Sequence, residues 1–422
     1  MVLPLMDISG QPAVLGHLQR VLAGDRMAST WIFAGPEGVG KFTTATALAA
    51  VKLCEHPKQS SNADGPRVRL PGLDPQFSLL EACGQCASCR AIRAGSHPDL
   101  HLVHRRLVRL YDKSGKSKAT TLSIQVIRSE ITGDASPDNR VESKLYTRSK
   151  LGRGKWFIID EADLMQVEAQ NALLKALEEP PPGTYLVLIS ASPSDLLSTI
   201  RSRAQIVPFQ SLPLDALGRA LMARGLTETQ ARQLARISNG SLGRAMQWLS
   251  ASSNEAQAND EKPASAKSRA KKSANSPAEP DATGEPPPVF NWINQICTMM
   301  DKIAQHQAGG MNMADLLARC ADQFAGIGLK RDSLASRDRL VRDGVMTMLG
   351  IIGEWLDDQL RLATGTRPTA PLPTRLTGLP AEMIQHCLEI CQTAQRQVDQ
   401  NAHVNLLLAS TGTAIEGALR AH

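Results

Sequence analysis

The sequence predicts an α/β domain built on a doubly wound parallel sheet, followed by a small helical domain and an all-helical C-terminal domain. Short, wholly apolar segments alternate with helical segments over the first half of the chain. A glycine-rich turn joins the first of these apolar strands to a helix. In the last third of the chain, apolar residues recur at the i, i+3, i+4 and i+7 spacing of one helix face.

The glycine-rich turn has the spacing of a phosphate-binding loop, running from Gly35 through Gly38 and Gly40 to Lys41. Glycines let the backbone N–H groups curl around phosphate oxygens, and the lysine reaches the terminal phosphates. The next residue is ordinarily Ser or Thr, whose hydroxyl ligates magnesium, but here it is Phe42. We therefore expect a binding element for ATP and Mg²⁺ whose metal chemistry is compromised.

Two carboxylates follow a second apolar strand, which ends at residue 159. In a parallel α/β sheet, ligands lie at the carboxyl ends of the strands, so these side chains should face the same crevice as the phosphate loop. Asp160 suits a metal ion or its water, and Glu161 suits a general base that orients an attacking water. The alternative is an acidic cap on the next helix.

Four cysteines have the spacing of metal ligands: Cys54, Cys83, Cys86 and Cys89. Four thiolates around one ion form the closed tetrahedral site that structural zinc takes. An iron–sulfur cluster is an alternative, because the C-x2-C-x2-C run formed by Cys83, Cys86 and Cys89 also occurs in ferredoxins. His97 as a ligand and simple buried thiols are further alternatives. We expect a structural Zn²⁺ module over residues 54–89, without a catalytic role.

Charge and hydropathy limit the class of protein. The net charge is +6, and residues 104–155 carry 13 Lys and Arg against 5 Asp and Glu. That segment is either a solvated loop or a contact for an acidic partner or a nucleic-acid backbone. The start of the chain does not resemble a signal peptide, and no apolar run is long enough to cross a bilayer. We expect a cytoplasmic protein whose cysteines are thiols or metal ligands.

Composition and pattern divide the chain into four parts. We expect a nucleotide-binding domain over 1–210, a helical lid domain over 211–250, a disordered linker over 251–288 and a helical domain over 289–422. The linker is rich in Ala, Ser, Pro, Lys and Glu and has no aromatic residue, so it has little apolar surface to bury.

The order of these motifs resembles the AAA+ clamp-loader subunits of bacterial DNA polymerase III. The loop ending at Lys41 is similar to their Walker A motif, residues 158–163 to Walker B, and the cysteines to their zinc module. The run Asn-Ala-Leu-Leu-Lys-Ala-Leu-Glu-Glu-Pro at 171–180 and the pair Ser202-Arg203 are also similar to family signatures. The resemblance covers about residues 1–250, and by position the last domain would be the family's oligomerisation collar.

Departures from the pattern indicate the type of subunit. Phe42 replaces the magnesium hydroxyl, Ala204 replaces the cysteine of Ser-Arg-Cys, and Gly243 stands in place of a sensor arginine. A damaged nucleotide site beside an intact Arg203 resembles the delta-prime type. That resemblance implies that Arg203 is an arginine finger acting on a neighbour's ATP and that Glu161 is at most a weak base.

The resemblance also implies the partners of the chain. They are gamma/tau- and delta-type subunits in a hetero-oligomer, with the sliding clamp and primed DNA reached through the complex, and no membrane. The alternative is an ATP-hydrolysing gamma/tau-type motor, which the retained Asp160 and Glu161 favour.

Overall fold

The computed structural model describes residues 4–24, 27–62, 70, 72–111, 120–133, 141–249, 287–306, 312–331, 336–366, 372–373, 378–400 and 402–420. The chain forms two compact units, one of Met1–Leu217 with Gly240–Gly243 and one of Gly218–Asn239 with Arg244–His422. The domain limits expected at 210, 250 and 288 stay a prediction. The expected linker lies almost wholly outside the described residues.

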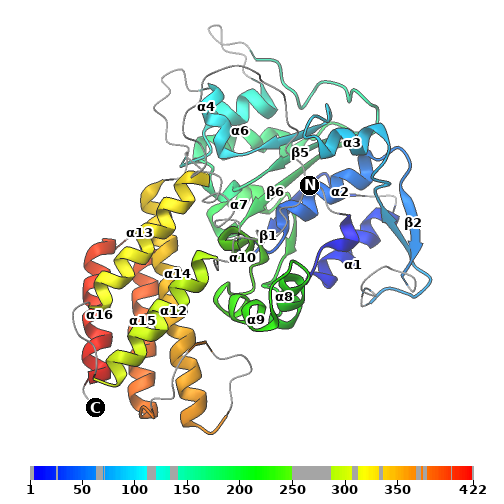
Figure 1. The fold of residues 1–422 in the computed structure, drawn as a ribbon. Coiled ribbons are helices and arrows are strands. Elements are labelled where there is room, and N and C mark those ends of the chain that lie inside the picture. Colours follow the sequence, from blue (N-terminus) through cyan, green and yellow to red (C-terminus); the bar gives the residue numbers. More distant parts are fainter. Residues whose placement is uncertain are drawn as a thin grey trace, which may run out of the picture. The chain divides into compact units, whose positions relative to one another are not determined.

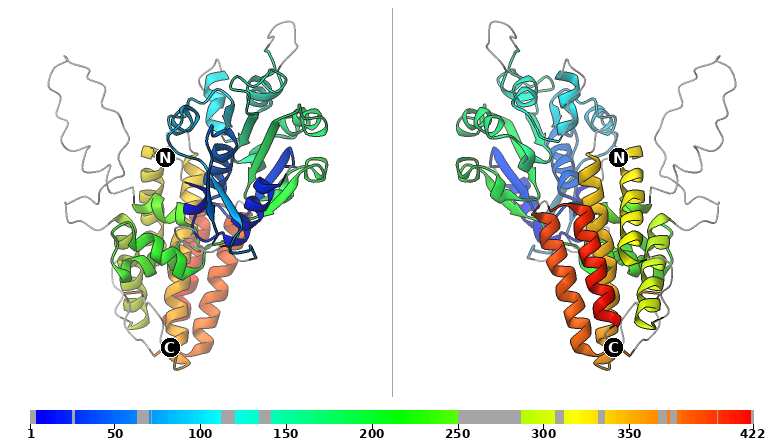
Figure 2. Two further views of the ribbon diagram at one scale, coloured as in Figure 1. Left: turned by 90° about the vertical axis from the view of Figure 1, so that its right-hand side faces the viewer. Right: turned by 90° about the vertical axis from the view of Figure 1, so that its left-hand side faces the viewer.

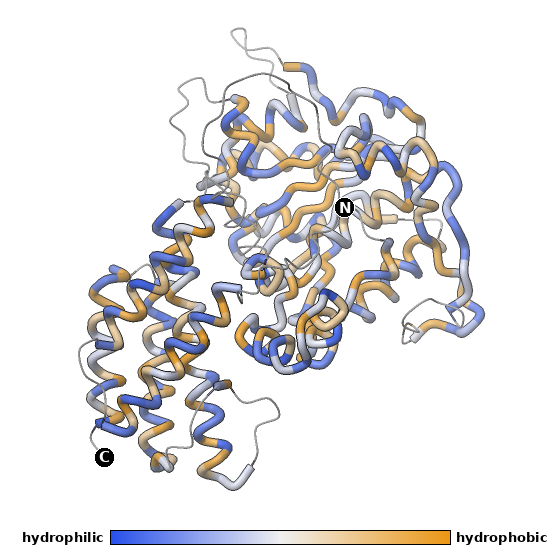
Figure 3. The backbone as a smooth tube through the Cα atoms, in the orientation of Figure 1, coloured by the Kyte–Doolittle hydropathy of each residue, from blue (hydrophilic) through white to orange (hydrophobic). Residues whose placement is uncertain are grey.

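The first unit is built on a five-stranded parallel sheet (Figure 1), as the sequence predicts. Its strand order is β4-β5-β6-β1-β7. The strands are β1 (Thr30–Ala34), β4 (Leu100–Val103), β5 (Lys155–Ile159), β6 (Thr184–Ser190) and β7 (Gln205–Pro208). The strands β1 and β5 are buried along their whole length and are apolar in Figure 3, as expected for strands covered on both faces.

Helices cover both faces of this sheet. On one face, Ile32 and Phe157 pack with residues of α5, η3, α6 and α7, including Val126 and Leu173. On the other face, the alternate residue Trp31 meets His17 of α1 edge to face, with ring centroids 6.1 Å apart. The first unit contains α1 (Pro12–Ala23), α2 (Lys41–Leu53), α3 (Ala87–Arg93), α4 (Val108–Tyr111), α5 (Ile124–Ile127), α6 (Val167–Glu178) and α7 (Ser198–Arg201).

Short helical turns complete this unit. They are η1 (Leu5–Asp7), η2 (Arg105–Leu107), η3 (Arg128–Thr132), η4 (Ala162–Leu164) and η5 (Pro193–Asp195). The helices α8 (Leu214–Met222) and α10 (Leu242–Leu249) each run across a boundary between the two units.

A small antiparallel sheet was not expected from the sequence. Here β2 (Lys58–Ser61) pairs with β3 (Ser78–Glu81). The buried Gln19 of α1 holds β3, because its side chain donates to the Leu80 carbonyl and accepts from the Leu80 N–H. Strands with so few apolar residues have no alternation to reveal them.

The second unit is helical, as predicted for the C-terminal part. Its helices are α9 (Glu228–Ile237), α12 (Pro288–Ala304), α13 (Met313–Arg331), α14 (Arg337–Ala363), α15 (Ala381–Asp399) and α16 (Val404–Arg420). The long helices α12 to α16 pack side by side (Figure 2) around an apolar core that includes Ile296, Ile352 and Ile415. Among the described residues, no helix is both long and apolar enough to cross a membrane.

Candidate nucleotide and metal sites

The phosphate-type loop begins where β1 ends. Gly35, Gly38 and Gly40 all have positive φ, at 144°, 73° and 103°, a region that favours glycine. A Cβ at Gly35 would lie 2.2 Å from the carbonyl oxygen of Phe209, so the first glycine also permits close approach to the end of β7. Gly40 is the N-cap residue of α2. The loop therefore has the strand–turn–helix setting expected of a phosphate-binding element.

Lys41 is turned inward onto the loop itself. Its ammonium group donates to the carbonyl oxygens of Gly35 and, at 2.7 Å, Pro36. The side chain is buried, and this burial lowers its pKa, although Glu37, Asp163 and Asp160 oppose the shift. The lysine thus contacts its own loop where a phosphate-binding lysine contacts a ligand.

A returning segment of the same unit holds the tip of the loop. The N–H of Gly243 donates to the Gly38 carbonyl at 2.8 Å, and the Ser241 hydroxyl donates to the Glu37 carbonyl at 2.8 Å. A Cβ at Gly243 would lie 2.7 Å from the Gly38 Cα, so this approach requires glycine. The close contact with Gly38 therefore explains why residue 243 has no side chain.

The first turn of α2 offers few free hydroxyl groups. Phe42 is 38% exposed and carries none. The hydroxyl of Thr44 donates to the Gly40 carbonyl at 2.8 Å, and that of Thr46 to the Phe42 carbonyl at 2.9 Å. The hydroxyl ligand that position 42 normally provides is therefore missing here.

Asp160 lies at the carboxyl end of β5, and it and Lys41 affect each other's pKa. Its Oδ1 accepts the Glu161 N–H at 3.0 Å. Burial is the main cause that raises the pKa of this carboxyl to about 6, and the Glu161 carboxylate adds to the effect. Because β1, β6 and β5 are parallel, this carboxylate and the phosphate-type loop lie at the same edge of the sheet, and their sharing of one crevice stays a prediction.

Glu161 is paired with a residue that sequence reasoning missed. Its Oε2 lies 2.6 Å from Nε of Arg105, whose side chain is 11% exposed. The register supplies the reason, because Val103 of β4 is opposite Ile159 of β5, so the residues two places further on also meet. Because the Arg105 guanidinium occupies Oε2 of Glu161, that oxygen is not free to orient an attacking water.

Asp160→Asn is expected to stabilise the fold at neutral pH. The folded-state pKa of about 6 lies above the ordinary value of about 3.9. The carboxylate therefore costs stability increasingly as the pH rises between these values, and nothing below them. The amide removes this cost, and its oxygen can still accept the Glu161 N–H. Urea unfolding should show a gain of about 1–3 kcal/mol at about pH 7.5 and almost none at about pH 3.5.

The exposed Asp195→Asn is the matched control for Asp160→Asn and should leave both unfolding curves nearly unchanged. An equal gain at both pH values for Asp160→Asn would contradict the burial argument.

Arg203 lies away from the phosphate-type loop, just before β7 begins. One of its Nη atoms is 2.9 Å from Glu178 Oε1, and the other donates to the Thr199 carbonyl at 3.0 Å. The structure thus pairs Arg203 with Glu178. The Arg203 side chain is 37% exposed and so remains accessible to solvent.

The four cysteines converge. All four sulfur atoms lie within 4.8 Å of one another. Three of the sulfur–sulfur distances are 3.6 Å, 3.9 Å and 3.9 Å. A tetrahedron of sulfurs about 2.3 Å from a central zinc has edges of about 3.8 Å. The donor set fits one tetrahedral ion, whereas a multi-iron cluster would require the sulfurs to be further apart, because they bind more than one iron.

Backbone donors already orient the sulfurs. The N–H groups of Gln85 and Cys86 donate to Cys83 Sγ at 3.4 Å and 3.3 Å, and the N–H of Cys83 donates to Cys54 Sγ at 3.2 Å. Cys86 is the N-cap residue of α3, and its sulfur accepts the Cys89 N–H. Such N–H···S bonds favour thiolate ligands.

His97 does not join this cluster. Its Nε2 lies 2.9 Å from the Ser88 hydroxyl, and its Nδ1 accepts the Asp99 N–H at 3.1 Å. Both ring nitrogens are engaged, so the alternative of a histidine ligand is wrong for this geometry.

Gln11 is a further residue that the sequence did not single out. It is buried at the start of α1, and its amide donates to the Gln210 carbonyl at 2.6 Å and the Val39 carbonyl at 3.4 Å. It therefore ties the phosphate-type loop to the segment that follows β7. A glutamine before a proline gives no recognisable sequence signal for such a role.

The comparisons with known proteins agree with this geometry. Residues 74–213 match the family model described as DNA polymerase III, delta subunit. The chain is 33% identical over 229 residues to the DNA polymerase III subunit delta' of Bacillus subtilis, covering 54% of this chain and 56% of that protein. It is 33% identical over 168 residues to the Escherichia coli K12 subunit delta', covering 39% and 44%. The matched part of this chain is therefore similar to subunits of DNA polymerase III.

The chain is also similar to subunits of the gamma/tau type. DNA polymerase III subunit tau of Bacillus subtilis is 27% identical over 217 residues, covering 50% of this chain and 30% of that protein. The chain spans about half the length of the delta' relatives it matches. The solved structure of a DNA polymerase III gamma subunit-related protein from Thermotoga maritima is 15% identical in sequence, with a TM-score of 0.35. The alignment covers 96% of this chain and 99% of that protein. The fold assignment rests on the sheet order of this chain instead.

Proposed function

We propose that this chain is a delta-prime-like subunit of the DNA polymerase III clamp loader, one that hydrolyses little or no ATP itself and supplies Arg203 to a neighbour's ATP site. In this proposal it assembles with gamma/tau- and delta-type subunits, and it meets the sliding clamp and primed DNA through that complex. The names of the relatives support the complex.

One observation carries the proposed loss of hydrolysis. The residue after Lys41 is Phe42, which has no oxygen with which to ligate magnesium. Two further contacts support this loss. Lys41 is turned inward, which removes a phosphate contact, and Arg105 holds Glu161, which restrains the candidate general base. A nucleotide that bound here would lack both its metal ligand and a free general base.

The position of Arg203 supports action on a neighbour. Arg203 precedes the amino end of β7, whereas the phosphate-type loop follows the carboxyl end of the adjacent parallel strand β1. About five residues of extended chain, roughly 15 Å, separate the two edges. An arginine side chain does not span that distance, which supports action of Arg203 on a nucleotide bound by another chain.

We also infer that the four cysteines hold one structural zinc ion. Four thiolates without a free coordination position give the ion no place for a substrate or water. Its role would be to fix α3 to the end of α2, where Cys54 is the C-cap residue.

The second candidate function is that of a hydrolysing gamma/tau-type motor. It is favoured by the retained Lys41 and Asp160, which share one edge of the sheet, and by the similarity to subunit tau. It predicts magnesium-dependent ATPase activity of the isolated chain.

Arg203→Ala is expected to lower the clamp- and DNA-stimulated ATPase rate of the reconstituted complex by about 10³-fold or more, the range of arginine fingers in general. The guanidinium stabilises transition-state charge only when the neighbour is docked. The measurement is ATPase rate and subunit assembly with the partner subunits, and the isolated chain is assayed alongside.

The nearby exposed Arg201→Ala is the control, because Arg201 is also an arginine at the end of α7. If the Arg203→Ala protein assembles normally and the stimulated rate is unchanged, the trans role is wrong. Strong ATPase of the isolated chain that disappears in Lys41→Ala would instead favour the motor.

A further inference from the structure

Glu178 is the last residue of α6, and it holds Arg203 by the 2.9 Å ion pair described above. The Arg203 guanidinium has two further contacts, with the Thr199 carbonyl at 3.0 Å and the Ser202 hydroxyl at 3.4 Å. Among the described residues that contact the Arg203 guanidinium, Glu178 is the one with a carboxylate. The guanidinium is therefore held by α6 through Glu178 and by α7 through Thr199.

The place of Glu178 is unfavourable for the helix that carries it. The C-terminus of a helix has a partial negative charge, so an acidic residue there costs typically about 0.3–1 kcal/mol. The neighbouring Glu179 is also acidic and stands at the C-cap position. Two carboxylates at this end need a compensating role, and the contact with Arg203 provides one for Glu178 alone.

We propose that Glu178 is a positioning residue for Arg203, holding the guanidinium in the orientation that meets a neighbour's nucleotide. This inference rests on the proposed trans role of Arg203. The pair is half-exposed, at 37% and 49%, so it is easily rearranged and contributes little to stability. The ion pair would instead restrict the conformations of the Arg203 side chain before it meets the phosphates of the neighbour's nucleotide.

Glu178→Gln tests this inference in the reconstituted complex. At saturating amounts of the substituted subunit, the stimulated ATPase rate should fall about 3- to 10-fold. The amount of subunit needed for half-maximal stimulation should stay the same, because docking is unaffected. Glu178→Asp should recover part of the rate. The matched control is Glu179→Gln, since Glu179 is exposed and its carboxylate has no hydrogen bond or ion pair with the described residues.

A double substitution separates the two proposals. In an Arg203→Ala background, Glu178→Gln should have no further effect on the rate, because the residue acts only through Arg203. If Arg203→Ala lowers the rate but Glu178→Gln does not, Glu178 has no positioning role and the trans role survives. If Glu178→Gln lowers the rate equally with and without Arg203, it acts on the architecture of α6 and the inference is overturned. If Arg203→Ala has no effect, the proposed function itself fails.

Discussion

Loss of the metal from the cysteine cluster is expected to unfold the segment from Cys83 to Arg93. The purified protein should contain one zinc ion per chain, and a chelator or Cys86→Ser should remove it. Structural zinc in small modules contributes apparent binding energies of about 10–16 kcal/mol. The four sulfurs lie within 4.8 Å of one another. The proposed zinc ion would bind all four, and without these metal–sulfur bonds the segment would lose its cross-link. Elemental analysis and hydrogen exchange of this segment are the measurements.

Gln85→Ala is the control for the cysteine substitution. Gln85 lies in the same loop and is exposed, and only its backbone N–H contacts a ligand sulfur. Its substitution should leave the metal content and the protection of the segment unchanged. Metal-free protein with full protection, or iron with a visible absorbance band in place of zinc, would contradict the zinc assignment.

Local patterns in the sequence were enough to predict the sheet and its carboxyl edge. The strands β1 and β5 are apolar after their first residue because helices cover both faces, so each appears as an uninterrupted apolar run bounded by polar residues. The pairing of β2 with β3 could not be read in this way. Strand β3 is held by Gln19 from a distant helix, and a single buried amide has no periodic signal.

The same distinction applies to the candidate sites. The cysteines and the glycine-rich loop have fixed spacings, so they were found, and the cysteines do converge. Arg105 could have been predicted from the expected parallel pairing of its strand with the strand before Glu161. The sequence showed Gly243 in place of an arginine. Its contact with Gly38, however, forms only because the chain returns to the loop about 200 residues later. No local pattern encodes such a contact.

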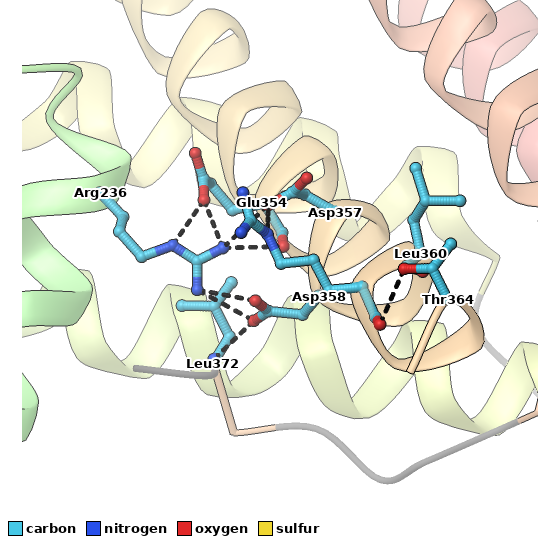
Figure 4. Close-up of polar contacts among 8 residues, drawn as sticks. Arg236, Glu354, Asp357, Asp358, Leu360, Thr364 and Leu372 are labelled. Atoms are coloured by element: carbon cyan, nitrogen blue, oxygen red, sulfur yellow. Dashed lines mark hydrogen bonds and ion pairs between the residues drawn. The ribbon is translucent and has the colours of Figure 1, made fainter. Parts of the chain in front are cut away.

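Arg236→Met is expected to destabilise the helical unit by about 3–5 kcal/mol. Arg236 of α9 lies among the carboxylates of α14 (Figure 4), 2.6 Å from Glu354 and 2.8 Å from Asp358. The Asp358 side chain is 0% exposed and also accepts the Leu372 N–H at 2.9 Å. Burial raises the pKa of Asp358, and the Arg236 charge opposes this. Without Arg236, a buried carboxylate would have to stay charged without its cation or take up a proton.

Two comparisons make the Arg236 prediction specific. Arg232→Met removes an arginine from the preceding turn of α9, where its pair with Glu228 is exposed, so it should cost less than about 1 kcal/mol. Asp358→Asn in the Arg236→Met background should restore most of the lost stability, because the amide is uncharged at every pH. Unfolding in urea at about pH 7.5 and pH 4.5 is the measurement, and the loss should be smaller at the lower pH, where Asp358 can be protonated. A loss that is the same for Arg232→Met and Arg236→Met would mean that burial of the charge is not the cause.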